Sequence, residues 1–569
     1  MKNHRPTVLL LVLAAGIFVG CSNAVEQPVY PNRWVRVQTS LRSDEELARV
    51  VDLVQRAAAS GVNGIALSAG LDSLDLKSED YFQRLAELRQ VCEAEQVDIV
   101  PSFWSAGYGG GILAHNKNLA AGIPVKEALF VVRNGEGKLV PDPTAEIQNG
   151  GFEELADGEL AGFTIPGQLG GVLHHDTETF KQGRASLRFE RFTEFPEENA
   201  RIRQRVSVTP HRHYRVSGWI RAEGLDEDDP FGSANFRVEV FGGEDARRLQ
   251  YENPRYDRDG EWHRFAVAFN SWGYDYVEIQ PQVTDTRQGQ LWLDELTIEE
   301  IALVNVLRRP GTPLVVQGET SGLTYVEGED FAPVSDPVFN FRVAHDGPPI
   351  EILPGSRIRD GERLRVSFYH PALIYRNQTP ICMSEPETYA IWQDQAVRVH
   401  EALGPSKYLL NMDEVRVGGS CEACKSRGMT NAEILGDCIT RQHGILRGVN
   451  PDAEIAIWSD MLDPHHNANP SRKYYYLAES TFVDAWKYVP KDLVIVCWYY
   501  NIREQSLQHF SNLGFRTMAG AYYDADDLEN PKGWLEALYK TPGACGIMYT
   551  TWLNKYDLME EFGKLVSKR

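Results

Sequence analysis

A strand–helix alternation, interrupted once in the middle of the chain, most constrains what this sequence can fold into. Apolar segments at Trp34–Thr39, Val62–Leu67 and Val97–Phe103 alternate with amphipathic helical patterns, and this βαβαβ order predicts a parallel sheet or barrel. Five further segments follow the interruption: Tyr408–Asp413, Glu454–Trp458, Leu493–Trp498, Arg516–Ala521 and Gly546–Thr551. Because eight parallel strands close a barrel, we expect a (β/α)8 TIM barrel.

The interruption lies between the third and fourth expected barrel strands. Short alternating strand patterns at roughly ten-residue spacing occupy it, which is typical of β-sandwiches. We expect a jelly-roll β-sandwich over residues 146–301, nested in a small β-domain that is split into residues 126–145 and 302–374. The barrel then takes residues 30–125 and 375–569, so the expected fold is an α/β barrel with all-β insertions after strand three.

The N-terminus carries a targeting pattern that we exclude from the fold. Lys2 and Arg5 form a basic region, Val8–Phe18 an apolar region too short to span a bilayer, and Val19-Gly20-Cys21 a small-residue cleavage site. Residues 1–21 resemble a bacterial lipoprotein signal, which implies acylation of Cys21 and attachment to a bacterial membrane, on its periplasmic or cell-surface face, through this lipid alone. An ordinary signal peptide with an incidental cysteine is the alternative. Both interpretations predict an exported protein.

The charge balance excludes one class of partner. The 569 residues include 80 Asp and Glu against 58 Lys and Arg, which gives a formal net charge of -22. Such a charge repels phosphate backbones, so we expect no nucleic acid partner. The sequence leaves the oligomeric state open.

The five later strand patterns all end in carboxylates or aromatic residues. The carboxyl ends of barrel strands converge on one pocket, so these side chains should line a common site. Aromatic rings stack on sugar faces and carboxylates bind sugar hydroxyl groups, and this composition therefore predicts a glycan site. The residues concerned are Asp413, Glu414, Trp458, Asp460, Trp498, Tyr522, Tyr523, Asp524 and Trp552.

In the order of these motifs, residues 380–560 resemble glycoside hydrolase family 20, the β-N-acetylhexosaminidases. The resemblance implies that Glu414 is the general acid and base and that Asp413 orients the 2-acetamido group of the substrate. The acetamido carbonyl oxygen then attacks the anomeric carbon, so no enzyme nucleophile is needed. The implied activity is the removal of terminal β-linked GalNAc or GlcNAc, with no cofactor for catalysis.

The resemblance also implies roles for the aromatic residues. Trp458, Trp498 and Trp552 would enclose the acetyl methyl group. Tyr522, two residues before Asp524, would bind the acetamido oxygen, and Asp524 would bind a sugar hydroxyl. Tyr523 and Asp460 are expected to contact substrate as their neighbours.

Two positions depart from the pattern of the family. Its His-x-Gly-Gly before the acid pair is replaced by Leu409-Leu410-Asn411-Met412, and its Trp-x-Glu after strand eight reads Trp552-Leu553-Asn554. Asn554 at the place of a residue that binds distal hydroxyls leaves the choice between GlcNAc and GalNAc open. His465 is expected at the mouth of the site, with an ordinary surface loop as the alternative.

The ends of the expected sandwich resemble jelly-roll carbohydrate-binding modules. Gly151-Phe152-Glu153 opens it and Trp292-Leu293-Asp294-Glu295 closes it, and in such modules these motifs often surround a structural calcium ion. Hard carboxylate oxygens suit calcium, so Glu153 and Asp294 are the candidate ligands. The alternative is that both acids are surface groups at strand ends.

One cysteine pair has metal-site spacing. Cys421 and Cys424 form half of a zinc motif, but no second CxxC or HxxxH follows closely. A local disulfide or plain thiols are the favoured interpretations, with Cys438 as a possible third participant.

Two other functions remain open from the sequence. One is a retaining glycosidase whose nucleophile is a protein carboxylate, Asp460 or Asp524, facing Glu414. The other is a lipoprotein that captures glycans without cleaving them.

Overall fold

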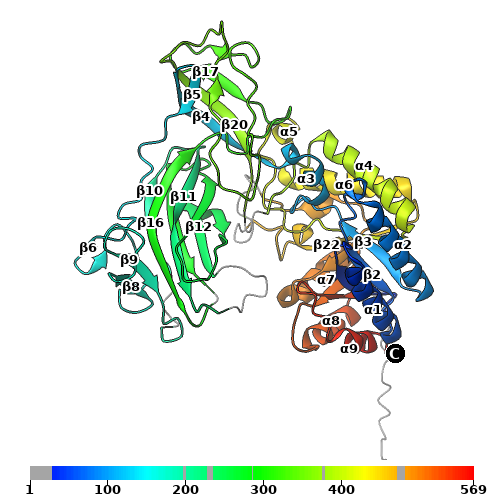
Figure 1. Cartoon of the computed structure of the whole chain (residues 1–569). Coiled ribbons are helices and arrows are strands. Elements are labelled where there is room, and N and C mark those ends of the chain that lie inside the picture. Colours follow the sequence, from blue (N-terminus) through cyan, green and yellow to red (C-terminus); the bar gives the residue numbers. More distant parts are fainter. Residues whose placement is uncertain are drawn as a thin grey trace, which may run out of the picture.

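The computed structural model describes residues 29–195, 200–226, 235–284, 286–374, 378–470 and 481–568. The expected signal segment, residues 1–21, lies outside them. Eight parallel strands close a barrel in chain order, interrupted after the third strand as the sequence predicts (Figure 1). They are β1 (Asn32–Gln38), β2 (Gly64–Ser68), β3 (Asp98–Phe103), β21 (Lys407–Leu410), β22 (Glu454–Trp458), β23 (Val494–Cys497), β24 (Arg516–Tyr522) and β25 (Ala544–Thr550).

Helices pack around this barrel between most of its strands. The Ser43 side chain caps the first of them, and Thr430 with Glu433 forms a capping box on another. The helices are α1 (Asp44–Ser60), α2 (Glu79–Ala94), α4 (Pro386–Leu403), α6 (Asn431–Val449), α7 (Arg503–Asn512), α8 (Glu529–Tyr539) and α9 (Met559–Val566). Between β22 and β23, the described residues form the 3-10 turns η3 (Asp460–Leu462) and η4 (Ala485–Tyr488), with no α-helix among them.

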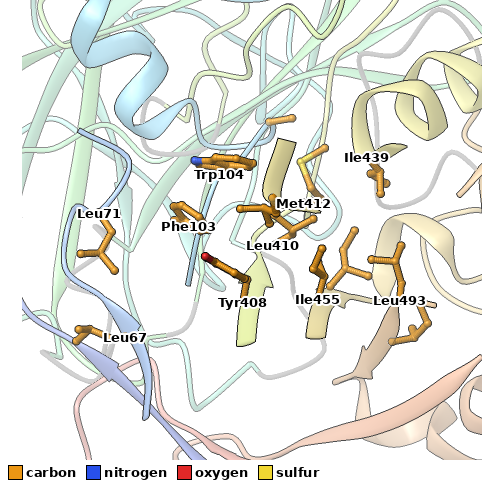
Figure 2. Close-up of a cluster of buried hydrophobic side chains, with 14 of the residues drawn as sticks. Leu67, Leu71, Phe103, Trp104, Tyr408, Leu410, Met412, Ile439, Ile455 and Leu493 are labelled. Carbon is orange, nitrogen blue, oxygen red and sulfur yellow. The ribbon is translucent and has the colours of Figure 1, made fainter. Parts of the chain in front are cut away.

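The barrel buries side chains in two separate layers. Side chains on the outer faces of the strands pack against the helices, and Figure 2 shows Phe103, Tyr408 and Leu410 within this layer. Side chains on the inner faces, such as Trp34 and Leu409, fill the barrel. Because successive strand residues point to opposite faces, each strand contributes to both layers.

The insertion after β3 contains a β-sandwich of two antiparallel sheets. One sheet has the order β10-β15-β12-β13 and the other β14-β11-β16-β9-β8. The two sheets share one hydrophobic core, which includes Phe189, Phe236 and Phe265. Their strands are β8 (Leu173–Asp176), β9 (Ser186–Phe189), β10 (Gln204–Ser207), β11 (His213–Glu223), β12 (Phe236–Gly242), β13 (Arg247–Glu252), β14 (His263–Asn270), β15 (Tyr276–Val283) and β16 (Gln290–Ile301).

A third antiparallel sheet combines segments from both sides of the sandwich. β4 (Gly122–Arg133) precedes the sandwich and pairs along its length with β20 (Arg363–Pro371), which follows it. The full order is β18-β17-β20-β4-β5-β19, with β5 (Glu136–Leu139), β17 (Val315–Gly318), β18 (Thr324–Tyr325) and β19 (Ile350–Glu351). In the sequence, the sandwich is therefore nested inside this split sheet. Figure 1 shows the split sheet above the sandwich and the barrel to the right of both.

The sandwich contacts the loop that follows β21. Val417, in that loop, belongs to the sandwich's hydrophobic core. The sandwich is also bonded to the split sheet: Asn270 Nδ2 donates at 3.1 Å to the carbonyl of Pro124 in β4, and Gln250 Nε2 donates at 2.8 Å to the carbonyl of Leu373, just after β20. The inserted domains are thus packed against the same end of the barrel that carries Asp413 and Glu414. No described helix is both long and apolar enough to cross a membrane.

Candidate active site

A cavity of about 500 Å³ opens at the carboxyl ends of the barrel strands. Its wall combines two adjacent acids, one cation, three tryptophans and several polar groups. The lining residues are Arg36, Gln38, Ser105, Tyr108, Asn411, Asp413, Glu414, Trp458, Trp498, Tyr523 and Trp552. The cavity therefore collects residues from most of the strand ends, as the convergence of a barrel requires.

Alternation along the strands decides which side chains reach this cavity. In and beyond β21, Leu409 fills the barrel and Asn411 and Asp413 continue its inward face, while Tyr408 and Leu410 pack outward. The same alternation brings in Arg36 and Gln38 from β1, Trp458 from β22, Trp498 directly after β23 and Trp552 just after β25.

Glu414 reaches the cavity because its backbone leaves the strand pattern. Its φ is 48°, in the left-handed region that non-glycine residues rarely adopt, so Glu414 and Asp413 both line the cavity although they are neighbours. Gly107 makes this possible, since a Cβ there would lie 2.4 Å from the carbonyl oxygen of Asp413. Gln378 Nε2 donates to the carbonyl oxygens of Gly107 at 3.0 Å and Glu414 at 3.1 Å, which ties the two loops together.

One oxygen of the Glu414 carboxylate is held by the protein. The Tyr108 hydroxyl and, at 3.2 Å, Nη2 of Arg416 both donate to Oε2. Arg416 is itself oriented by a 2.7 Å bond from its Nε to Gln378. Among the described residues, none donates a hydrogen bond to Oε1.

Asp413 titrates far above its usual range. Burial, with the negative charges of Asp460 and Glu414, raises the pKa of Asp413 to about 8, and Arg36 opposes this shift. Shifted pKa values of this kind are typical of active sites, where neighbouring ionisable groups must differ in protonation state to act as acid and as base. Because these carboxyl groups interact, protons leave them as a group rather than one residue at a time.

Asp460 lies behind the cavity wall and organises it. Its Oδ2 accepts hydrogen bonds from the backbone N–H of Glu414 at 2.9 Å and from Nδ2 of Asn467 at 2.8 Å. Its Oδ1 faces Nε1 of Trp498 at 3.4 Å. Asp460 is fully buried, and burial raises its pKa to about 6. It does not line the cavity, so the expected substrate contact is replaced by a positioning role.

The aromatic wall is fixed by polar partners at its edges. Nε1 of Trp458 donates to Oδ1 of Asn411 at 3.0 Å. The Arg36 guanidinium lies 4.1 Å from the ring centre of Trp552 and donates at 3.0 Å to the carbonyl of Thr551. Trp498 stacks in parallel with Tyr523, with ring centres 6.2 Å apart. These rings offer a rigid apolar surface of the kind that sugar faces occupy.

Tyr522 does not line the cavity, which corrects the sequence-based expectation. Its φ of 84° turns the side chain to the outer layer, where it is buried and stacks on Tyr549 with ring centres 3.9 Å apart. Tyr523, one residue later, lines the cavity instead.

Asp524 also does not line the cavity, and its carboxylate bonds to the segment after β25 instead. Oδ2 accepts a 2.8 Å hydrogen bond from the backbone N–H of Trp552, and Oδ1 accepts one from the Thr551 hydroxyl. Asp524 thereby fixes the loop that presents Trp552.

Two further residues expected at the site, His465 at its mouth and Asn554 at the place of the residue that binds distal hydroxyls, also lie outside the cavity. His465 is exposed and packs edge-on against His509, whereas the next residue, His466, is buried and stacks on Tyr499 behind Trp498. Asn554 is exposed beside Tyr556, whose hydroxyl lies 3.3 Å from Asn554 Oδ1.

The two candidate calcium ligands in the sandwich, Glu153 and Asp294, both accept hydrogen bonds from the backbone of residues 181–185. Oε1 of Glu153 accepts backbone N–H bonds from Arg184 at 2.7 Å and Ala185 at 3.3 Å. Oδ2 of Asp294 accepts a backbone bond from Lys181 at 2.7 Å, and Asp294 is fully buried, which corrects the view of it as a surface group. Calcium binding by this pair stays a prediction.

Several cavity residues were missed by the sequence interpretation. Arg36 and Gln38 lie on the inward face of β1, so the alternation that identified the strand could have found them. Tyr108 lies in a glycine-rich loop, where no strand or helix pattern fixes the direction of a side chain. Arg416 does not line the cavity but donates to the Glu414 carboxylate, and the only sequence feature that could have pointed to it is its place two residues after Glu414.

No protein-family model matches this chain, and no curated protein matches it. Among solved structures, the CBM22-1 xylan-binding domain of Xyn10C from Paenibacillus barcinonensis is 18% identical, with a TM-score of 0.20 over 28% of this chain and 96% of that domain. A rhamnosidase from Novosphingobium sp. PP1Y is 9% identical, with a TM-score of 0.33 over 95% of this chain and 59% of its own. The carbohydrate-binding module TmCBM61, in complex with β-1,4-galactotriose, is 16% identical, with a TM-score of 0.20 over 26% of this chain and 94% of that module. At these TM-scores the similarities do not assign the chain to a family.

Proposed function

We propose that this protein is an exo-acting glycoside hydrolase on a (β/α)8 barrel, and that it removes terminal β-linked N-acetylhexosamine, GlcNAc or GalNAc. The proposal includes export and a lipid anchor on Cys21. The 2-acetamido group of the substrate acts as the nucleophile, and the configuration at the anomeric carbon is retained.

The adjacent acid pair in an aromatic cavity carries this proposal. Among the described residues, Asp413 and Glu414 are the acids that line the cavity. Both carboxylates considered as protein nucleophiles are engaged elsewhere: Asp460 holds the Glu414 backbone and Asp524 holds the Trp552 loop. A mechanism in which the substrate supplies its own nucleophile fits a cavity with this set of acids.

The roles follow from the contacts. Glu414, protonated, donates its proton to the leaving-group oxygen while the acetamido carbonyl oxygen bonds to the anomeric carbon and the glycosidic bond breaks. Asp413 accepts a hydrogen bond from the acetamido N–H, and the Tyr523 hydroxyl donates to its carbonyl oxygen. Glu414 then removes a proton from the water that opens the oxazolinium ring. Trp458, Trp498 and Trp552 surround the acetyl group.

The first test replaces the proposed acid. Glu414→Gln should lower kcat on aryl 2-acetamido-β-glycosides by about 10²–10⁴-fold. The loss should be smaller with a dinitrophenyl leaving group, which departs without protonation. Glu401→Gln, an exposed residue on α4, is the matched control and should keep full activity. Unchanged activity in Glu414→Gln would exclude the assignment.

A second test separates the two retaining mechanisms. A thiazoline analogue of the oxazolinium intermediate should inhibit competitively, and a 2-fluoro glycoside should leave no covalent adduct in the intact mass spectrum. An adduct on Asp460 or Asp524 would establish a protein nucleophile instead. Binding of glycans without turnover of aryl GlcNAc, GalNAc, galactose and glucose substrates would indicate a capture protein.

A further inference from the structure

Three buried cysteine sulfurs form a triangle beside the proposed catalytic loop. Sγ of Cys382 lies 3.4 Å from Sγ of Cys421 and 3.7 Å from Sγ of Cys424, and the last two are 3.8 Å apart. Each of the three residues is at most 3% exposed. Cys438, the third participant considered from the sequence, is buried beside Tyr389 instead.

The dimensions of this triangle match a tetrahedral metal site. Zinc–thiolate bonds of about 2.3 Å place neighbouring sulfurs of a tetrahedron roughly 3.8 Å apart. A disulfide would need two of the sulfurs at about 2.05 Å, and it would leave the third thiol unpaired. We propose that Cys382, Cys421 and Cys424 together bind one zinc ion.

The chain places these ligands by local structure. Cys421 is the N-cap residue of α5 (Glu422–Lys425), so one helical turn brings Cys424 back beside it. Cys382 comes from the segment before α4, whose backbone is fixed by bonds from Ile381 N–H to the Ala106 carbonyl at 2.9 Å and from Cys382 N–H to the Leu119 carbonyl at 2.8 Å. The three sulfurs are therefore preorganised by two separate parts of the chain.

A buried cation, Arg309, lies next to the site. Each thiol loses its proton to solvent on binding, so zinc with three thiolates carries one negative charge. Nη1 of Arg309 lies 3.9 Å from Sγ of Cys421 and also pairs with Glu385. Outer-sphere donors of this kind hold thiolate ligands in the orientation that the metal needs.

The zinc would clamp the loop that carries the acid pair. Cys421 lies seven positions after Glu414, and Cys382 four positions after Gln378. Gln378 contacts the Glu414 carbonyl and Arg416, and Arg416 contacts the Glu414 carboxylate. A metal that joins the two segments would therefore limit the motion of Glu414. This metal site stands whether or not the proposed glycosidase activity does.

Metal analysis of the full chain, purified without chelator, tests the proposal directly. We expect about one zinc per chain by elemental analysis, as a single thiolate site requires. Cys382→Ser, Cys421→Ser and Cys424→Ser should each lose the zinc. Cys438→Ala is the matched control, because it removes another buried thiol outside the triangle and should retain zinc.

Two measurements on the unaltered protein remain informative if these variants fail to fold. Apoprotein titrated with cobalt(II) should show thiolate-to-metal charge transfer and the visible bands of tetrahedral cobalt, and zinc should abolish both. Titration of thiols in denaturant with chelator should find all seven cysteines of the mature chain after Cys21 reduced. A pair of missing thiols with the mass of a disulfide would overturn the proposal, as would seven free thiols in a protein that binds neither metal.

Discussion

The backbone N–H of Glu414 donates a 2.9 Å hydrogen bond to Oδ2 of Asp460, so the proposed acid is held through its main chain by a carboxylate from the neighbouring strand end. This bond supports a backbone conformation, φ of 48°, that a glutamate rarely adopts. Asp460 is therefore best understood as a residue that positions Glu414.

Replacement of Asp460 should separate positioning from nucleophilic attack. Asp460→Asn should lower kcat by about 10²-fold, because misplacement of a catalytic group by about 1 Å costs that much, while KM changes little. Azide added to Asp460→Ala should not restore hydrolytic activity or form a glycosyl azide. Recovery of activity with formation of an α-glycosyl azide would show that Asp460 is the nucleophile.

Tyr522 and Tyr523 provide a matched pair of hydroxyl deletions. Tyr523→Phe should lower kcat/KM by about 10²-fold, since it removes the donor to the oxygen that attacks the anomeric carbon. Tyr522→Phe should keep kcat/KM, because Tyr522 packs outside the barrel against Tyr549. Steady-state kinetics of both variants on one aryl substrate measure these effects. A larger loss of kcat/KM in Tyr522→Phe than in Tyr523→Phe would show that Tyr522, and not Tyr523, binds the acetamido oxygen.

These two tyrosines show where sequence reasoning reaches its limit. The eight barrel strands and the point of interruption could be predicted, because alternating apolar segments depend on local pattern alone. Alternation also places Trp458 and Asp413 inward. At Tyr522 the positive φ reverses the alternation of inward and outward side chains. No residue type in this segment indicates a positive φ, so the sequence could not predict the reversal.

The polar partners of the site were harder to predict for a related reason. Tyr108 and Gln378 come from two segments that contact each other, through Gln378 and Gly107, and that both contact Glu414. Cys382 likewise contacts Cys421 and Cys424 although α4 and β21 lie between them in the sequence, so a motif search restricted to closely spaced cysteines does not find it. Long-range packing decided these positions.

A glycine in β24 leaves room for the aromatic wall. A Cβ on Gly520 would lie 3.0 Å from Cζ3 of Trp458 and 3.2 Å from Cβ of Trp498. Gly520→Ala should displace these rings and raise KM several-fold with a smaller change in kcat, because substrate is held less well before and during the reaction. Gly444→Ala, on α6 with no atom within 4 Å of the added Cβ, should leave kinetics unchanged. An unaltered KM in Gly520→Ala would show that the wall is not a substrate contact.

The high pKa of Asp413 makes stability depend on pH in a definite direction. The unfolded-state pKa is near 3.8 and the folded-state pKa is about 8, so between these values the folded state binds more protons than the unfolded state. Stability contributed by protonated Asp413 is therefore present at low pH and is lost as pH rises toward 8. Asp413→Asn removes this loss, since the amide never ionises.

Asp413→Asn should therefore unfold at a higher temperature than the unaltered protein at pH 8, with the difference shrinking toward pH 4. We expect a gain on the order of 1 kcal/mol at pH 8, well below the full value of the shift, because the carboxyl borders a cavity that opens to the surface. Calorimetry across this pH range measures it. Asp557→Asn, at an exposed position, is the control and should follow the unaltered protein. If Asp413→Asn showed no gain at pH 8, Asp413 would have to be an ordinary ionised carboxylate, and the coupling between the cavity acids would be absent.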